Sequence, residues 1–201
     1  RFLADLAGGQ KTGWFFDQRE NRDSVARLAQ GARLLDLYCH TGGFGVQALA
    51  AGAAAVQAVD RSDAALELAA RSAELNMVAD RCRFQRGDAF ETMESLAAAR
   101  DRFDIVVADP PAFAKSKKDL GQAARAYRKL ARLSAALVAP GGFLFIASCS
   151  HHMTVENFGE QVARGLADSG RTGRILRASG AGPDHPVHPA LPESAYLKAL
   201  L

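Results

Sequence analysis

The chain has 201 residues, of which 48% are hydrophobic and 23% charged, and its formal net charge is +3. These values lie near the averages for globular proteins, so they exclude a disordered chain, a collagen and a coiled-coil rod. The length predicts a single domain over residues 1–201, with a lead-in helix and loop in residues 1–30. No apolar run approaches the roughly 18 residues of a membrane span, and the first residues lack a signal peptide's apolar core. We therefore expect no membrane association.

Short apolar runs alternate along the chain with longer amphipathic stretches, which is typical of βαβ units and a mostly parallel sheet. The predicted strands are 33–38, 55–60, 82–86, 103–108, 143–148, 174–178 and 196–201. The predicted helices between them are 44–51, 63–77, 92–99, 120–138 and 155–169. The fourth of these helices should end before Pro140-Gly141-Gly142, a strong helix breaker. Residues 180–195 carry four prolines and are predicted to form a loop.

Polar and glycine residues follow the first two predicted strands. The segment LLDLYCHTGGFG places Asp36 on the first strand and then Gly42, Gly43 and Gly45 at the start of a helix. Glycines there let a backbone approach a ligand closely and expose helix N-terminal amides. Asp60 ends the second strand, 24 residues after Asp36, near the offset at which an acid meets a nucleotide ribose. The glycine spacing is not GxGxxG, which argues against a dinucleotide.

The next three strands also end in groups able to do chemistry. The third is followed by Asp88, the fourth by Asp109-Pro110-Pro111, and the fifth by Cys149 between two serines. In an open α/β sheet, ligands bind at the carboxyl ends of the strands. All five strand ends should therefore contribute to one site.

With the segments DLYCHTGGFG, VDRS, GDAF, DPPAFAK and SCS, the sequence resembles the class I S-adenosylmethionine-dependent methyltransferases. More narrowly it is similar to the bacterial 23S rRNA 5-methylcytosine methyltransferase family, a similarity that includes KTGWFFDQRENR at the start and DHPVHPALPESAYLKAL at the end. The resemblance implies a Rossmann-like α/β fold with strand order 3-2-1-4-5-7-6, an antiparallel last strand and helices on both faces. It also implies S-adenosylmethionine as the cofactor and large-subunit ribosomal RNA as the partner.

The resemblance assigns roles residue by residue. The implied cofactor-binding residues are Asp36, Gly42, Gly43 and Gly45 for the methionine part, Asp60 for the ribose, Asp88 and Phe90 for the adenine, and Gln18, Arg19 and Arg22 for the carboxylate. Pro110, Pro111 and Lys115 are expected to touch the RNA substrate. Lys117 and Lys118 follow, and further basic residues at 81–86 and 125–132 are either phosphate contacts or a solvated surface.

Cytosine methylation at carbon 5 explains the need for Cys149. Carbon 5 is too weak a nucleophile until a thiolate adds to carbon 6. Cys149 is the cysteine placed for that step, and Asp109 at the neighbouring strand end is expected to hydrogen-bond the base. Cys39 and Cys82 are interpreted as packing residues. The three cysteines have no metal-ligand spacing, so we expect free thiols, no metal and a cytoplasmic setting.

Two departures from the family pattern matter. Family members carry an N-terminal RNA-binding PUA domain and a hairpin-rich segment, so we expect a catalytic domain from a longer chain or a lineage without those parts. Ala112 stands where eukaryotic-type RNA cytosine methyltransferases have a second cysteine, which favours a single-cysteine site.

Three other functions stay open at this point. Amine methyltransferases have an aromatic residue directly after the two prolines, whereas Ala112 precedes Phe113 here; uracil methyltransferases have an Asn where Ser150 stands. A binding module without catalysis would not need both DPP and SCS. A nicotinamide oxidoreductase is disfavoured by the glycine spacing.

Overall fold

The structure is a computed structural model that describes residues 1–7, 13–114 and 116–201. Within these residues the chain forms one seven-stranded sheet in the order β3-β2-β1-β4-β5-β7-β6. The strands are β1 (Arg33–Leu37), β2 (Ala55–Asp60), β3 (Cys82–Arg86), β4 (Phe103–Ala108), β5 (Val138–Ser148), β6 (Ala178–Ser179) and β7 (Lys198–Leu200). β1 to β5 are parallel, and β7 runs antiparallel to both β5 and β6. The predicted fold class and strand order are confirmed.

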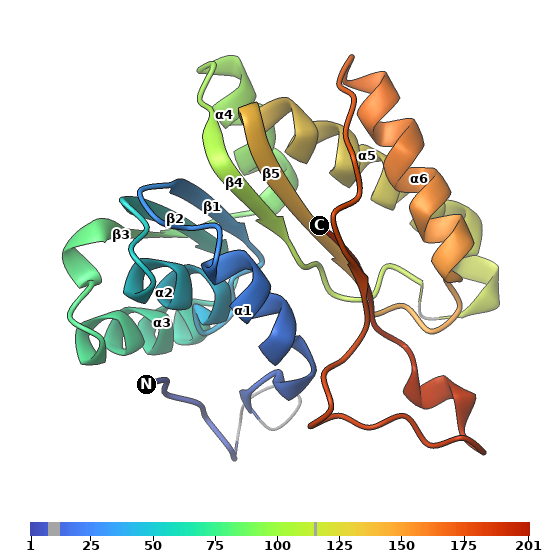
Figure 1. The fold of residues 1–201 in the computed structure, drawn as a ribbon, viewed down its shortest axis with the longest axis horizontal. Coiled ribbons are helices and arrows are strands. Elements are labelled where there is room, and N and C mark those ends of the chain that lie inside the picture. Colours follow the sequence, from blue (N-terminus) through green and yellow to red (C-terminus); the bar gives the residue numbers. More distant parts are fainter. Residues whose placement is uncertain (8–12, 115) are drawn as a thin grey trace.

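Helices cover both faces of this sheet (Figure 1). They are α1 (Arg19–Ala26), α2 (Gly43–Ala50), α3 (Asp63–Leu75), α4 (Ala89–Ala98), α5 (Leu120–Leu137) and α6 (Val155–Asp168). One core packs α1, α2 and α3 against the sheet, and the other packs α4, α5 and α6 against the opposite face. In β1, Leu34 and Leu35 are both fully buried, one in each core. That is why this strand reads as a continuous apolar run.

Side-chain caps explain where three helices begin. Ser62 accepts a hydrogen bond from the Ala65 amide at 3.2 Å, and Asp88 accepts one from the Glu91 amide at 3.0 Å. Thr154 does the same for α6. Because Asp88 is the cap, α4 begins at Ala89, three residues before the predicted start at Thr92.

Several predicted boundaries differ from the structure. β1 ends before Tyr38, whose φ of 61° leaves the extended region. β5 begins at Val138 rather than residue 143, because the predicted breaker lies inside the strand, where Gly141 has a φ of 77°. β6 covers two residues rather than 174–178, since a ladder with β7 forms only there. Among the described residues, no helix is long and apolar enough to cross a membrane.

Candidate active site

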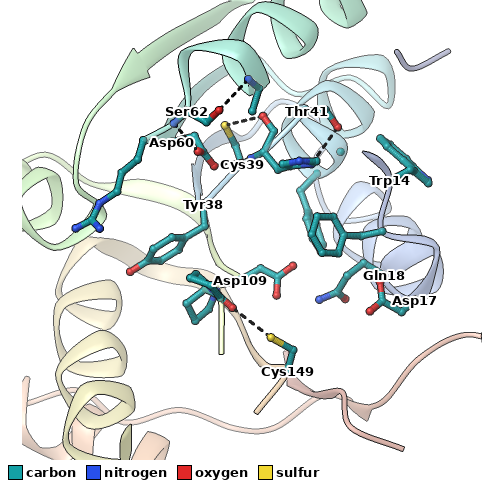
Figure 2. A pocket seen from close by; sticks show the side chains of 18 of the residues that line it. Trp14, Asp17, Gln18, Tyr38, Cys39, Thr41, Asp60, Ser62, Asp109 and Cys149 are labelled. Carbon is teal, nitrogen blue, oxygen red and sulfur yellow. Dashed lines mark hydrogen bonds between the residues drawn. The ribbon is translucent and has the colours of Figure 1, made fainter. Parts of the chain in front are cut away.

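The carboxyl ends of the central strands open into a cavity of about 830 Å³. Ten of the predicted site residues line it: Gln18, Arg22, Gly43, Asp60, Asp88, Phe90, Asp109, Pro110, Pro111 and Cys149. In the view of Figure 2, Asp60 and Cys149 lie at opposite ends of this cavity with Asp109 between them. The sheet therefore brings together strand ends that are up to 111 residues apart in sequence, from Tyr38 after β1 to Cys149 after β5.

The turn after β1 is shaped by residues behind the cavity wall. Asp36 does not line the cavity; its carboxylate is fully buried and accepts a hydrogen bond from the Gly45 amide at 2.8 Å. Burial raises the pKa of Asp36 to about 7. A Cβ on Gly45 would lie 2.9 Å from the Val56 side chain, and Gly42 adopts a φ of 79°. Asp36, Gly42 and Gly45 thus fix the path of the turn, and Gly43 faces the cavity.

Asp60 is held at the end of β2 by two backbone amides. One carboxylate oxygen accepts from the His40 amide at 2.9 Å and the other from the Ser62 amide at 2.9 Å. His40 reaches this position because it adopts a φ of 48°, an uncommon value for a residue other than glycine. The carboxylate is therefore fixed in orientation while still lining the cavity.

Asp88 and Phe90 form the wall next to Asp60. Burial alone would raise the pKa of Asp88, but the amides of Glu91 and Phe90 and the Arg61 guanidinium hold it below its ordinary value. The Phe90 ring lies 6.2 Å from the Phe113 ring, centre to centre. This wall offers an apolar face beside an ionised carboxylate.

The start of α1 and the turn before it close the other side of the cavity. Gln18 and Arg22 both line it, and both are almost fully buried. Arg19 does not: its side chain is 55% exposed and pairs with Asp184 at 2.9 Å, so the structure does not support a cofactor contact by Arg19. Arg19 and Arg22 are one helical turn apart, but Arg22 is the one that faces inward.

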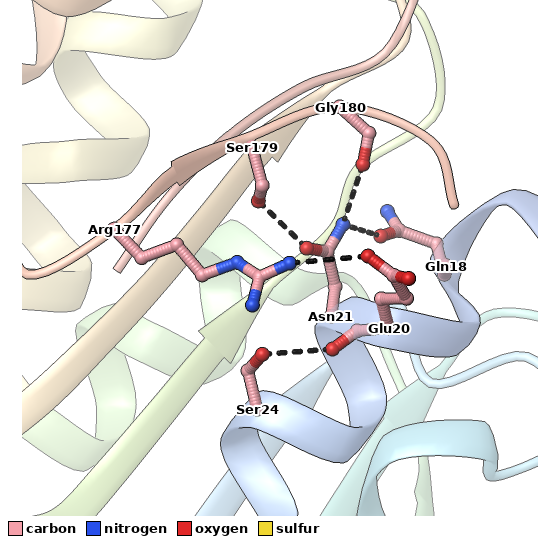
Figure 3. A network of polar contacts seen from close by, with 7 residues as sticks. All are labelled: Gln18, Glu20, Asn21, Ser24, Arg177, Ser179 and Gly180. Atoms are coloured by element: carbon pink, nitrogen blue, oxygen red, sulfur yellow. Dashed lines mark hydrogen bonds and ion pairs between the residues drawn. The ribbon is translucent and has the colours of Figure 1, made fainter. Parts of the chain in front are cut away.

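Asn21 ties this segment to β6 (Figure 3). It donates to the Gln18 side chain at 2.7 Å and accepts from the Ser179 hydroxyl at 2.7 Å. An ion pair between Glu20 and Arg177 joins the same two segments. Gln18 is therefore held in the cavity wall by residues from the far end of the chain.

Within the part of the chain that the structure describes, two buried polar atoms in this wall have no hydrogen-bond partner. They are Asp17 Oδ1 and Arg22 Nε, in side chains that are only 4% and 5% exposed. The other oxygen of Asp17 accepts from the Tyr196 hydroxyl at 2.5 Å, and an Arg22 terminal nitrogen donates to the Phe15 carbonyl at 2.8 Å. A buried acceptor and a buried donor left unsatisfied in a cavity wall indicate a ligand that carries both kinds of group.

The loops after β4 and β5 meet at Cys149. Its thiol lies 3.8 Å from the Pro110 carbonyl and is partly buried. Beneath it, the Tyr127 hydroxyl bonds both Ser148 at 2.8 Å and Ser150 at 2.9 Å. Ser150 also accepts from the Ala114 amide at 3.2 Å, which joins the two loops. These contacts fix Cys149 relative to Asp109 and the two prolines.

The other two cysteines are in different surroundings. Cys39 is 5% exposed, and burial raises its pKa well above the ordinary value. Burial also raises the pKa of Cys82, to about 12. Both thiols are therefore poor candidates for ionisation, which agrees with their interpretation as packing residues.

Basic residues near the cavity are only in part available for an outside partner. Arg128 pairs with Asp168 and Lys129 with Glu94, while Arg81 donates to the Ala53 carbonyl. Lys117 and Lys118 are exposed beside the Pro110 loop. Lys115, a predicted substrate contact, lies outside the described residues.

Asp17, His40 and Tyr196 are among the residues of the cavity wall that sequence reasoning missed. Tyr196 was interpreted only as the start of a strand, and its contact with Asp17 joins positions 179 residues apart. No local pattern predicts such a pair. Among the described residues, no cluster of three or more His, Cys, Asp or Glu side chains could hold a metal ion.

The strand order, the glycine turn and the carboxylate ending β2 define a class I nucleotide-cofactor fold of the methyltransferase type. A family model for S-adenosylmethionine-dependent methyltransferases matches residues 1–201. The chain belongs to this family, and S-adenosylmethionine is its cofactor.

Relatives and solved structures support this assignment. The chain is 42% identical over 202 residues to ribosomal RNA large subunit methyltransferase I of Aeromonas hydrophila, and 37% identical over 199 residues to the protein of that name from Citrobacter koseri. It covers 51% and 50% of those proteins, so it spans about half the length of these curated relatives. The structure of SMU.776 complexed with SAH matches 93% of this chain and 49% of that one, with a TM-score of 0.82 and 26% identity.

Proposed function

We propose that the chain is the catalytic domain of a ribosomal RNA methyltransferase that makes 5-methylcytosine in large-subunit RNA through a thiolate adduct of Cys149. The observation that carries the proposal is that Cys149 and Asp109 line the same cavity as Asp60 and the glycine turn. The names of the curated relatives support ribosomal RNA as the substrate.

The cavity suits S-adenosylmethionine. The amino-acid end of this cofactor carries an ammonium and a carboxylate, which complement the unsatisfied Asp17 oxygen and Arg22 nitrogen. The Asp60 carboxylate, oriented by two amides, suits the ribose hydroxyls, and Phe90 suits the adenine. When bound, the cofactor supplies an electrophilic methyl group on its sulfonium.

The residues of the β4 and β5 loops suit a cytosine. Asp109 offers a carboxylate to the Watson–Crick edge of the base, and Pro110 and Pro111 offer apolar surface to its ring. The thiolate of Cys149 forms a bond to carbon 6, which makes carbon 5 nucleophilic enough to take the methyl group. Loss of the carbon-5 proton then breaks the carbon–sulfur bond and returns the thiolate.

The test is to incubate the chain with S-adenosylmethionine and unmodified large-subunit ribosomal RNA, digest the RNA and identify the methylated nucleoside by mass spectrometry. We expect 5-methylcytidine, and none from the Cys149→Ser variant. Methylation of an exocyclic amine or of uracil would reject the proposal in favour of the corresponding class of methyltransferase.

A further inference from the structure

Lys198 on β7 is a buried lysine beside the cavity. It is 6% exposed, and its ammonium donates a hydrogen bond to the Ser150 carbonyl at 2.7 Å. Among residues 1–7, 13–114 and 116–201 no carboxylate forms an ion pair with it. Removing an ammonium from water without a carboxylate partner costs several kcal/mol. A buried charge of this kind indicates a use other than stability.

The sheet register places this lysine against the cysteine turn. Lys198 lies opposite Ser148 in the antiparallel β5–β7 pair, so the two side chains share a face of the sheet. From there the side chain extends past the end of β5 to the carbonyl of the residue after Cys149. The hydroxyls of Ser148 and Ser150 are held from α5 by Tyr127. Lys198 holds the backbone of the same turn from β7.

The charge of Lys198 also acts on the thiol. Burial lowers the pKa of Lys198, whereas a Cys149 thiolate would raise it, so the two charges attract each other. Within the described residues, Tyr127 and Tyr196 also interact electrostatically with the thiol, and Asp109 and His151 line the same cavity. Burial raises the pKa of both tyrosines, which keeps them neutral. Asp109, as a carboxylate, would oppose ionisation of the thiol, and Lys198 offsets it.

We propose that Lys198 is a positioning residue for the methyl-transfer reaction: it fixes the Ser148–Ser150 turn and supplies the positive charge that favours the thiolate of Cys149. The proposal rests on the proposed function only in taking Cys149 as the nucleophile. Lys198 acts through the cysteine, and no contact between Lys198 and RNA is required.

The test measures how fast iodoacetamide alkylates Cys149 as a function of pH, in the 201-residue chain without RNA, with each alkylated cysteine mapped by peptide mass. Cys39 and Cys82 serve as internal controls because their pKa values are raised. Lys198→Gln removes the charge but keeps a donor, and Lys198→Arg keeps the charge. Arg171→Gln is the matched control, since Arg171 donates to the Val138 and Ala139 carbonyls at the opposite end of β5.

We expect the wild-type alkylation midpoint to lie below the free-cysteine value of about 8.5. Lys198→Gln should move it up by about one pH unit, which is about a tenfold lower rate near pH 7. Lys198→Arg and Arg171→Gln should leave it within about half a unit. Calorimetry with S-adenosylhomocysteine shows that each variant is folded.

The proposal is overturned if a folded Lys198→Gln protein keeps the wild-type midpoint. It is also overturned, whether or not that variant folds, if the wild-type midpoint lies at or above 8.5. The outcome is separate from that of the proposed function. A shifted midpoint without 5-methylcytosine formation would leave the role of Lys198 in place and reject the RNA reaction.

Discussion

The two ends of the cavity are built in different ways. At the β1–β2 end, Asp60 is oriented by the amides of His40 and Ser62, which are 20 and 2 residues away. At the β4–β5 end, the cavity is lined by Cys149, Tyr196 and Asp17, and Tyr196 donates a hydrogen bond to Asp17. These residues come from three segments spread over almost the whole chain. The end at Asp60 (the cofactor end, for ribose and adenine) is thus made of turns at adjacent strand ends. The end at Cys149 (the catalytic end) is an assembly of distant segments that includes Asp17, the proposed partner of the cofactor's ammonium.

We expect this difference to separate cofactor binding from methyl transfer. In the proposed reaction the cofactor's ribose meets Asp60, a carboxylate whose orientation is set by two backbone amides. The catalytic end depends on side chains whose positions are set by tertiary contacts, such as Tyr127 against Ser148 and Ser150. Substitutions at the two ends should therefore affect cofactor binding and methyl transfer separately.

The largest expected effect is at the catalytic end. Cys149→Ser should lower the methylation rate at least about a thousandfold, because a hydroxyl is too weakly acidic to serve as the nucleophile. Binding of S-adenosylhomocysteine, measured by calorimetry, should stay within about twofold, since the thiol is directed at the base rather than the cofactor. A variant that lost both activities together would show that the two ends are not separate.

Asp36 tests the support behind the cofactor turn. Its folded-state pKa of about 7 lies above the unfolded value of about 3.9, so the folded protein holds an extra proton between these values. The free energy of unfolding should therefore fall as pH rises from about 4 to 7. Asp36→Asn has no carboxyl proton to lose at this position, so its free energy of unfolding should not fall in this way. From pH 4 to pH 8, the difference in unfolding free energy between variant and wild type should therefore shift in favour of the variant by up to about 4 kcal/mol.

Urea unfolding at both pH values measures this change. Any loss of stability from the substitution that is the same at both pH values cancels when the difference at pH 4 is compared with the difference at pH 8. If the difference in unfolding free energy between variant and wild type is the same at pH 4 and pH 8, the carboxylate does not titrate in this range.

Asp60→Ala addresses the cofactor end directly. Charge-assisted hydrogen bonds contribute roughly 1.5–3 kcal/mol, so the variant should bind S-adenosylhomocysteine about 10- to 100-fold more weakly. Alkylation of Cys149 should proceed at the wild-type rate. Equal affinity of variant and wild type in calorimetry would remove Asp60 from the cofactor site.

The smallest effect concerns RNA outside the cavity. Because the formal net charge is only +3 and Arg128 and Lys129 pair with acids of this chain, the 201-residue chain by itself should bind RNA weakly. The logarithm of its affinity should fall with the logarithm of salt concentration, with a slope of about −0.7 for each single-strand phosphate contact. Filter binding at several salt concentrations gives the slope, and tight binding that ignores salt would contradict the expectation.

The same contrast explains what the sequence could predict. Fold class follows from the alternation of strands and helices, and the strand order from the family resemblance. Cavity residues such as Asp60, Asp109 and Cys149 follow from strand ends and motifs, which are local in sequence. Arg19 was expected at the cofactor, but its side chain pairs with Asp184 and does not line the cavity, and no local pattern shows this tertiary contact. Asp17, Tyr196 and Lys198 carry no local signal, since their roles depend on contacts between the first and last segments of the chain.

The most direct test of the proposed reaction is to trap the adduct. In RNA containing 5-fluorocytosine, carbon 5 has no proton to lose, so the carbon–sulfur bond should persist after methyl transfer. The account predicts a denaturation-resistant complex in the presence of S-adenosylmethionine, with the RNA attached to Cys149 in peptide mass spectra and with no complex from Cys149→Ser. Attachment at Cys39 or Cys82, or methylation by Cys149→Ser at the wild-type rate, would contradict it.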